Sequence, residues 1–295
     1  MNSYKYSEEN IAIGAVYKFL RESKNFTQKE AAGEEISIPQ LSNFENGKTI
    51  VGTQHFIVLL RNINVEMFEF QNAYNQYLRN NDILFFTVRI SEAVMERDVA
   101  KLKLFLLQVK KLLSMNPNSK RLKIDYIWIK SVLYFIDTSY ILTKNEEDVL
   151  ISYLFNLKEW GIYDIRLLGT CAQFIDVLKL AELTQRMINP IQMNIVSYHI
   201  KHAMIQCILN IINIFVEKKI FEPARRLILY LENTEIHDYF MFDKLTLIYN
   251  KANYSYQKGD PNAIEILNEC LKILEFCDCS KTATQVFKEI SNLKS

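Results

Sequence analysis

Glycine and proline are scarce in this sequence: seven glycines and five prolines stand among 295 residues, about a third of the usual combined share. So few backbone breakers argue against β-sandwiches, barrels and nucleotide-binding folds with glycine-rich loops, all of which need many tight turns. Collagen-like sequences are excluded on the same ground, and a share of 49% apolar residues excludes a disordered chain. An all-α fold is therefore expected.

Excess charge and a disulfide framework are also missing. The 35 basic and 34 acidic residues leave a net charge of +1, so the electrostatics of the whole chain point to no partner. Five cysteines, at positions 171, 207, 270, 277 and 279, form no regular spacing, which favours free thiols in a reducing compartment. No secretion signal and no apolar run near the ~20 residues of a membrane-spanning helix is present. A cytoplasmic protein without a membrane partner is expected.

Enzyme motifs are absent from the sequence as well. It contains no glycine-rich phosphate loop, no nucleophile elbow and no HExxH zinc motif. His199 and His202 would share one helical face, but the spacing supplies no third metal ligand. The Cys277-x-Cys279 pair lacks the second pair that a zinc site would need. No catalytic residue, cofactor or metal site is therefore expected.

Four of the seven glycines fall within the first 52 residues, which indicates short helices joined by tight turns in that region. Thr27-Gln-Lys-Glu30 and Ser37-Ile-Pro-Gln40 match the pattern of capping boxes, and Thr53 is expected to cap the next helix. Long helical patterns with short breaks follow, without a flexible linker. The expected domains are a helix-turn-helix module over 1–65, a connecting helix over 66–80, and a repeat domain over 81–295.

The module over 1–65 resembles the helix-turn-helix domains of phage repressors. The resemblance depends on the spacing between Gly14, Thr27-Gln28 and the run Leu41-Ser-Asn-Phe-Glu-Asn-Gly47. The two apolar residues of that run are expected to point inward. Glu45 cannot face a phosphate, so an internal bond is predicted for it. The third helix of such a domain lies in the DNA major groove.

Side chains around that third helix suit the recognition of DNA. Gln and Asn can each form two hydrogen bonds with adenine, and backbone amides at the start of the second helix would hold a phosphate. Residues 1–65 contain seven basic and seven acidic side chains, so one module should bind weakly and a homodimer is expected, on half-sites about one helical turn apart. The candidate DNA-binding residues are Arg21, Thr27, Gln28, Ser37, Ile38, Pro39, Gln40, Asn43, Asn46 and Lys48.

A repeat runs through the rest of the chain. Ala181, Ala224 and Ala263 open successive helices at spacings of 43 and 39 residues, and Ala100 precedes them by 81. Another capping box, Thr143-Lys-Asn-Glu146, opens the helix expected between Ala100 and Ala181. A period near 40 that recurs five times predicts stacked helical hairpins. The last two resemble tetratricopeptide repeats, so the expected fold is a helix-turn-helix bundle followed by an α-solenoid of about five tetratricopeptide-like hairpins.

Polar residues recur with the same period on the first helix of each hairpin, which lines the concave face of a solenoid. Amide side chains suit a peptide backbone, and arginine suits a carboxylate. For each residue the alternative is burial between helices or exposure on the convex face. The candidate peptide-binding residues are Arg166, Thr170, Gln173, Gln206, Asn210, Asn213, Thr246, Asn250, Asn253 and Tyr254.

The combination of the two parts resembles the Rgg family, the peptide-responsive regulators of low-GC Gram-positive bacteria. The resemblance covers nearly the whole chain and depends most on Gln40–Gly47 and Tyr256–Asp260. It implies a cytoplasmic, homodimeric transcription regulator of the quorum-sensing type that binds double-stranded DNA. A short signalling peptide would bind in the concave groove of the repeat domain. Some family members are linked across the dimer by a cysteine in the DNA-binding domain, and this chain has none there.

Two other functions stay open at this point. One is a tetratricopeptide-like scaffold that binds proteins and carries a helix-turn-helix that does not bind DNA. The other is an enzyme regulator or phosphatase-like relative, which would need a catalytic acidic or glutamine constellation on an N-terminal bundle. A stable dimer that does not bind DNA would favour the scaffold.

Overall fold

The computed structural model describes residues 8–80, 93, 98–188 and 198–293, and all regular structure within these ranges is helical. This confirms the all-α fold class. The chain divides into two compact units, Met1–Asp98 and Val99–Ser295. The expected break near Asn189-Pro190 and the first residues of the expected repeat domain, 81–92 and 94–97, lie outside the described residues.

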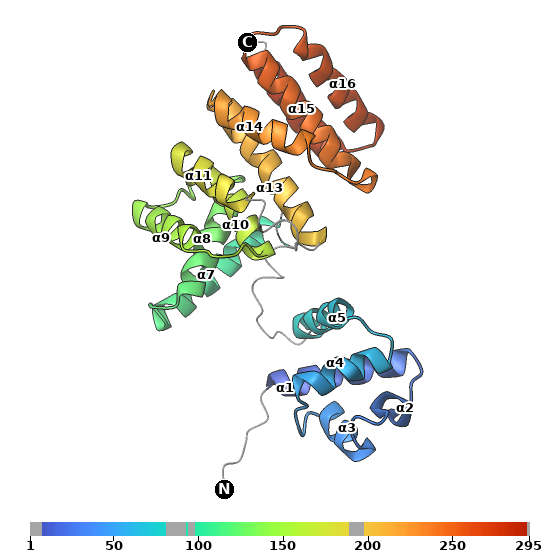
Figure 1. Ribbon diagram of the computed structural model, residues 1–295. Helices are drawn as coiled ribbons and strands as arrows, with labels where there is room; N and C mark the ends of the chain where they lie inside the picture. Colours follow the sequence, from blue (N-terminus) through green and yellow to red (C-terminus); the bar gives the residue numbers. More distant parts are fainter. Residues whose placement is uncertain (1–7, 81–92, 94–97, 189–197, 294–295) are drawn as a thin grey trace. The chain divides into compact units, whose positions relative to one another are not determined.

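Residues 8–80 of the first unit form the helices α1 to α5 (Figure 1). Its core is built from the fully buried side chains of Tyr17, Leu41, Leu59 and Ile63, and the Tyr17 hydroxyl donates to the Leu59 carbonyl over 3.1 Å. The helix expected as a connection is α5; it packs against α1 and places Phe70 in this core. The helices are α1 (Glu8–Ser23), α2 (Gln28–Ala32), α3 (Ile38–Glu45), α4 (Thr53–Asn62) and α5 (Met67–Asn80).

Local capping signals correctly place the starts of two of the three helices for which caps were predicted in this unit. Thr27 and Glu30 form the predicted capping box before α2, and Ser37 caps α3 by accepting from the Gln40 amide over 3.3 Å. The prediction for α4 is wrong by one residue. Thr53 is already in the helix, and Gly52, in an extended conformation, occupies the N-cap without a side-chain bond.

Gly14 shows why α1 needs a glycine where it crosses α3. A Cβ atom built at this position would lie 2.1 Å from the carbonyl oxygen of Phe44, far inside van der Waals contact. Because the obstacle is backbone, no side-chain rearrangement could relieve it. The glycine therefore permits the close approach that sets the position of α3 in this unit.

The second unit is a stack of helical pairs (Figure 1). The helices α8, α10, α13 and α15 pack side by side as one layer, with α9, α11, α14 and α16 as the second helices of the pairs, and α17 closes the stack against α16. The bounds are α7 (Val99–Met115), α8 (Lys120–Tyr134), α9 (Lys144–Phe155), α10 (Ile162–Cys171), α11 (Val177–Met187), α13 (Tyr198–Glu217), α14 (Phe221–Glu232), α15 (Met241–Gln257), α16 (Ala263–Phe276) and α17 (Ser280–Leu293), with short 3₁₀ turns η1 (Ala172–Phe174) and η2 (Asp238–Phe240).

Hydrogen bonds between first helices reproduce the predicted period. Asn210 on α13 donates to the Gly169 carbonyl on α10 over 2.7 Å, and Asn250 on α15 donates to the Leu209 carbonyl on α13 over 2.8 Å. Both pairs are separated by 41 residues, and the Cys171–Ser131 pair by 40. The period near 40 and the tetratricopeptide-like solenoid are thereby confirmed, because neighbouring repeats bond at the repeat length.

One described helix is long and apolar enough to cross a membrane by length and composition alone. It is the stretch His199–Glu217 of α13, with a mean hydropathy of 1.3. More than half of that stretch is buried, and α13 packs against α10, α14 and α15. An apolar helix buried on several sides is typical of a solenoid core.

Candidate nucleic-acid and peptide interfaces

The third helix of the first unit has one buried face and one exposed face. Leu41 and Phe44 are 0% and 3% exposed, as expected for residues that point inward. The candidate DNA-binding residues on the opposite side are all exposed, and we call them the recognition face: Ser37, Ile38, Pro39, Gln40, Asn43, Asn46 and Lys48. They combine amide groups, one apolar side chain at 44% exposure and a lysine, so this surface can offer hydrogen bonds and apolar contact together.

Arg21 does not belong to that surface. Its guanidinium donates to both carboxylate oxygens of Glu45, at 2.5 and 3.0 Å, and to the Phe26 carbonyl at 2.7 Å. The Arg21 side chain is 8% exposed, and the Glu45 carboxylate raises its pKa. The structure therefore corrects its assignment as a DNA ligand, because its donors are occupied inside the fold. The internal bond predicted for Glu45 is confirmed.

Thr27 and Gln28, expected to hold a phosphate, have partners within the first unit. The Thr27 hydroxyl donates to Glu30 over 2.7 Å, and the Thr27 backbone amide donates to the same carboxylate. These bonds hold the pKa of Glu30 below its usual value, so a negative charge already lies at the start of α2. The Gln28 amide donates to Glu45 over 2.8 Å. A phosphate at the start of α2 would have to compete with these bonds, and the phosphate role of the two residues stays a prediction.

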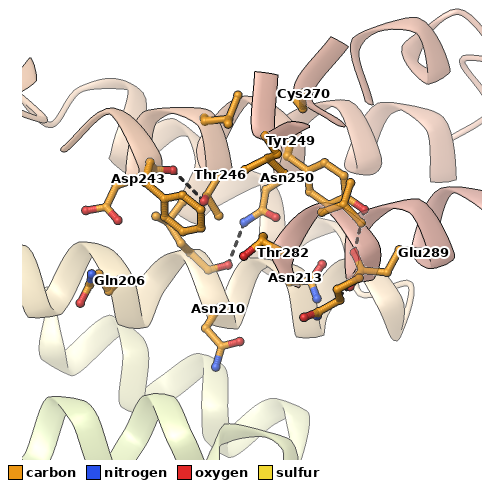
Figure 2. Close-up of a pocket in the computed structure, with 16 residues that line it drawn as sticks. Gln206, Asn210, Asn213, Asp243, Thr246, Tyr249, Asn250, Cys270, Thr282 and Glu289 are labelled. Atoms are coloured by element: carbon orange, nitrogen blue, oxygen red, sulfur yellow. Dashed lines mark hydrogen bonds between the residues drawn. The ribbon is translucent and has the colours of Figure 1, made fainter. Parts of the chain in front are cut away.

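Residues of α13, α15, α16 and α17 line a pocket of about 330 Å³ (Figure 2). Five of the ten candidate peptide-binding residues line it: Gln206, Asn210, Asn213, Thr246 and Asn250. They lie on successive first helices at the same repeat positions, which is why a 40-residue spacing brings them together. Leucine, phenylalanine and valine side chains from all four helices supply apolar walls.

The other five candidates lie outside the lining of this pocket. The hydroxyl of Thr170 donates to the Arg166 carbonyl and lies 3.3 Å from the indole nitrogen of Trp128. Asn253 is 6% exposed, and Tyr254 packs against Phe221 of α14. On α15, Asn253 and Tyr254 lie about one turn beyond Asn250, and they contact neighbouring helices instead of lining the pocket. The remaining two are Arg166, exposed on α10, and Gln173, half-buried in η1.

Asn210 and Asn250 were predicted either to face a peptide or to be buried between helices, and the structure shows features of both. Both line the pocket, yet both also use the side-chain nitrogen to bond a carbonyl of the preceding repeat. Asn250 is only 2% exposed. Each amide therefore uses one N–H in the inter-repeat contact, and its oxygen and second N–H are not used by that contact.

Sequence reasoning missed the contribution of α17 and of the acidic residues. Thr282, Gln285 and Glu289 of α17 line the pocket, as does Asp243 at the start of α15. A signal was present, because Glu289 follows Tyr249 by one repeat length, and the Tyr249 hydroxyl donates to it over 2.7 Å. Extending the 40-residue register past the last recognised hairpin would have indicated α17.

Two carboxyl groups stand near each other at one end of the pocket. Glu289 lines it, and Glu217 of α13 accepts a hydrogen bond from the lining residue Asn213 over 2.8 Å. Burial raises the pKa of Glu217 and the charge of Glu289 raises it further, while the hydrogen bond from Asn213 and the charge of Lys218 lower it in part. Burial and the same Glu289 carboxylate also raise the pKa of Tyr249. This end of the pocket therefore brings two acidic side chains close enough for their charges to interact.

Within the described ranges, no group of three or more His, Cys, Asp or Glu side chains could hold a metal ion. His202, one of the two histidines that share a helical face, lies 2.8 Å from Asp243 and stacks on Phe240. These two contacts lie within the repeat domain, where they join α13 to α15 and to η2.

The protein-family model for the C-terminal domain of the HTH-type transcriptional regulator Rgg matches residues 107–288 of this chain. The chain is also similar to the crystal structure of the SHP pheromone receptor Rgg2 from Streptococcus dysgalactiae, with a TM-score of 0.70 at 22% identity over 95% of this chain and 99% of that one. A putative transcriptional regulator from Listeria monocytogenes gives a TM-score of 0.74 at 14% identity, over 96% and 97% of the two chains. A receptor solved in a bacterial peptide pheromone complex gives 0.67 at 13% identity, over 96% and 99%.

Proposed function

Because the chain belongs to the Rgg family of helix-turn-helix transcriptional regulators, we propose that it binds operator DNA under the control of a short signalling peptide. The observation that carries the proposal is the pocket in the repeat domain, which combines apolar walls with peptide-compatible amides. All of its lining residues except Glu289 lie within the matched region. Relatives whose structures share this fold are described as peptide pheromone receptors. The proposed protein is a cytoplasmic homodimer without enzymatic activity.

The DNA-binding part of the proposal assigns the recognition face of α3 to the major groove. Its residues are exposed, while the opposite side of the helix is held in the core by Leu41 and Phe44. The balance of charge in residues 1–65 makes a single module a weak binder. Two modules in a homodimer would add their contacts on two half-sites.

The test is fluorescence anisotropy of the full chain on DNA from upstream of its own gene, across a series of salt concentrations. We expect saturable binding to one segment, weakened by salt as phosphate contacts require. Gln40→Ala should cost roughly 1–3 kcal/mol of specific binding, because the bond to a base edge is lost. Gln71→Ala, an exposed glutamine on α5, is the matched control and should leave affinity unchanged.

Two other results would contradict the proposed DNA binding through α3. Unchanged affinity of Gln40→Ala would remove α3 from the major groove. If a stable dimer binds its own upstream DNA no more tightly than scrambled DNA, with and without a peptide that occupies the pocket, the scaffold function would be favoured instead.

A further inference from the structure

The pocket between α13, α15 and α17 presents carboxylate and amide oxygens to a ligand (Figure 2). Asn210 and Asn250 each use one N–H to bond the Gly169 and Leu209 carbonyls. Asn250 lines the pocket, and within the described residues its side-chain oxygen accepts no hydrogen bond. This oxygen is not one of the enclosed polar atoms that lack a partner, so a donor on a ligand in the pocket can reach it.

The charged residues around the pocket also favour a ligand group that donates hydrogen bonds or carries a positive charge. Among the described residues, Asp243 and Glu289 are the acidic residues of the lining, and no lysine or arginine lines the pocket. Glu289 accepts from the Tyr249 hydroxyl at 2.7 Å and the Gln285 amide at 3.0 Å, but makes no ion pair within the described residues. Glu217 lies beside it, with a raised pKa that reflects burial and repulsion from Glu289. A cation placed here would relieve that repulsion.

The apolar side chains that line the pocket indicate what kind of group would carry such a cation. Leu209, Leu245, Leu274 and Val286 line the pocket together with Phe242, which is 50% exposed. A free inorganic cation would leave these surfaces unfilled. An ammonium group attached to an apolar stem would satisfy both the acceptors and the walls.

We propose that this pocket selects peptides through a primary ammonium group, at the N-terminus or on a lysine side chain, carried on apolar residues. The inference depends on the proposed function, since it names the ligand chemistry of the same groove. Asp243 is less available than Glu289, because His202 already lies 2.8 Å from it. Glu289 is therefore the carboxylate expected to discriminate among peptides.

The experiment uses the full chain and a synthetic library of seven-residue peptides built from Leu, Ile, Val and Phe. The library has four arms: a free or an acetylated N-terminus, each with or without one lysine. Peptides retained by the protein are identified by affinity selection and mass spectrometry. We expect peptides with an ammonium group to be retained at least about tenfold better than acetylated peptides without lysine, and the four arms show which ammonium is used.

Matched variants separate charge from fold. Glu289→Gln keeps an acceptor for Tyr249 and should abolish most of the preference, whereas Glu275→Gln, an exposed acid of α16 outside the pocket lining, should preserve it. Glu217→Gln tests the same acidic pair from α13, should Glu289→Gln fail to fold. Folding is checked by circular dichroism.

Two outcomes would overturn the inference in different ways. Retention that does not depend on an ammonium group in the wild type, or a preference unchanged in both Glu289→Gln and Glu217→Gln, rejects the selection of cations and leaves the peptide-binding function standing. If no peptide is retained better than by Thr246→Trp, which would fill the pocket, the proposed peptide-binding function fails and this inference fails with it.

Discussion

At the scale of single residues, Arg21 shows how a side chain suited to phosphate can serve the fold instead. It crosses from α1 to α3 and binds Glu45 through two of its nitrogens. Both side chains are nearly inaccessible, at 8% and 0% exposure. Breaking a buried ion pair by removing one partner leaves the other charged group desolvated, which costs far more than a surface pair contributes.

Arg21→Ala should therefore lower the free energy of unfolding of the first unit by about 3–5 kcal/mol. Both tryptophans, Trp128 and Trp160, lie in the second unit, so urea unfolding followed by tryptophan fluorescence reports on that unit alone. The transition seen by far-UV circular dichroism should shift, and the fluorescence transition should not. Arg61→Ala, at an exposed position of α4, is the control. Unchanged unfolding together with lost DNA affinity would return Arg21 to the DNA interface.

Asp125 is a second residue whose burial has a measurable consequence. It is 2% exposed on α8 and accepts from the Tyr163 hydroxyl over 2.8 Å. Burial raises the pKa of this carboxyl, although Tyr163 and Arg121 both lower it. The folded state thus binds the proton of Asp125 more tightly than the unfolded state does. Its favourable contribution is present below the unfolded pKa and is lost as the pH rises through the folded pKa.

Asp125→Asn imitates the protonated carboxyl and should remove that loss. We expect the unfolding free energy of the variant, minus that of the wild type, to increase between about pH 3 and pH 7. Urea unfolding at each pH, followed by Trp128 fluorescence, measures the difference. The same comparison for Asp148→Asn, an exposed position of α9, should show no such increase. A difference that falls with pH would mean that the ionised form is the stabilising one.

At the scale of elements, the stacking of first helices depends on side chains that reach one repeat back. Asn210 and Asn250 perform this contact at equivalent positions of α13 and α15. Their 40-residue spacing in the sequence was interpreted as a ligand-binding ladder, and the structure shows that the same ladder joins the repeats. A polar residue at such a position can therefore influence stability and binding together.

Asn250→Ala should lower the unfolding free energy of the second unit by about 1–3 kcal/mol, because a buried hydrogen bond is lost and a small cavity is left. Asn233→Ala provides the comparison, since its bond to the Leu229 carbonyl is exposed to water, and its loss should be smaller. Tryptophan fluorescence during urea unfolding follows both variants. Equal losses would show that the inter-repeat bond is not what makes Asn250 important.

At the scale of the whole molecule, the chain has two units that each contain their own hydrophobic core. In the proposed function, a peptide bound in one unit alters how DNA binds to the other. Such coupling is reciprocal: the factor by which peptide changes DNA affinity must equal the factor by which DNA changes peptide affinity.

With a peptide retained in the library selection, we expect a coupling factor in the usual range of about 5–150-fold. Anisotropy of labelled DNA with and without peptide gives one factor, and anisotropy of labelled peptide with and without DNA gives the other. Thr246→Trp should abolish both, because it fills the pocket. Peptide binding that leaves the DNA affinity of the wild type unchanged would refute regulation through this pocket.

The sequence alone determined what depends on short separations and on repetition. The capping boxes at Thr27 and Thr143 act over three residues, so local composition was enough to place the starts of α2 and α9. The period near 40 was visible because equivalent contacts select equivalent residues. At Gly52 the same local reasoning missed by one position, since glycine carries no side-chain signal.

Only the tertiary structure decided whether a polar side chain bonds another part of the protein or stays available to a ligand. Arg21 meets Glu45 across 24 residues, and Asn250 meets Leu209 across 41, so no local pattern reveals those partners. The acidic, acceptor-rich pocket depends on α17 folding back beside α15. Burial and partner choice arise from the packing of distant segments, and these determine whether a polar side chain is a ligand, a structural bond or, as for Asn250, both at once.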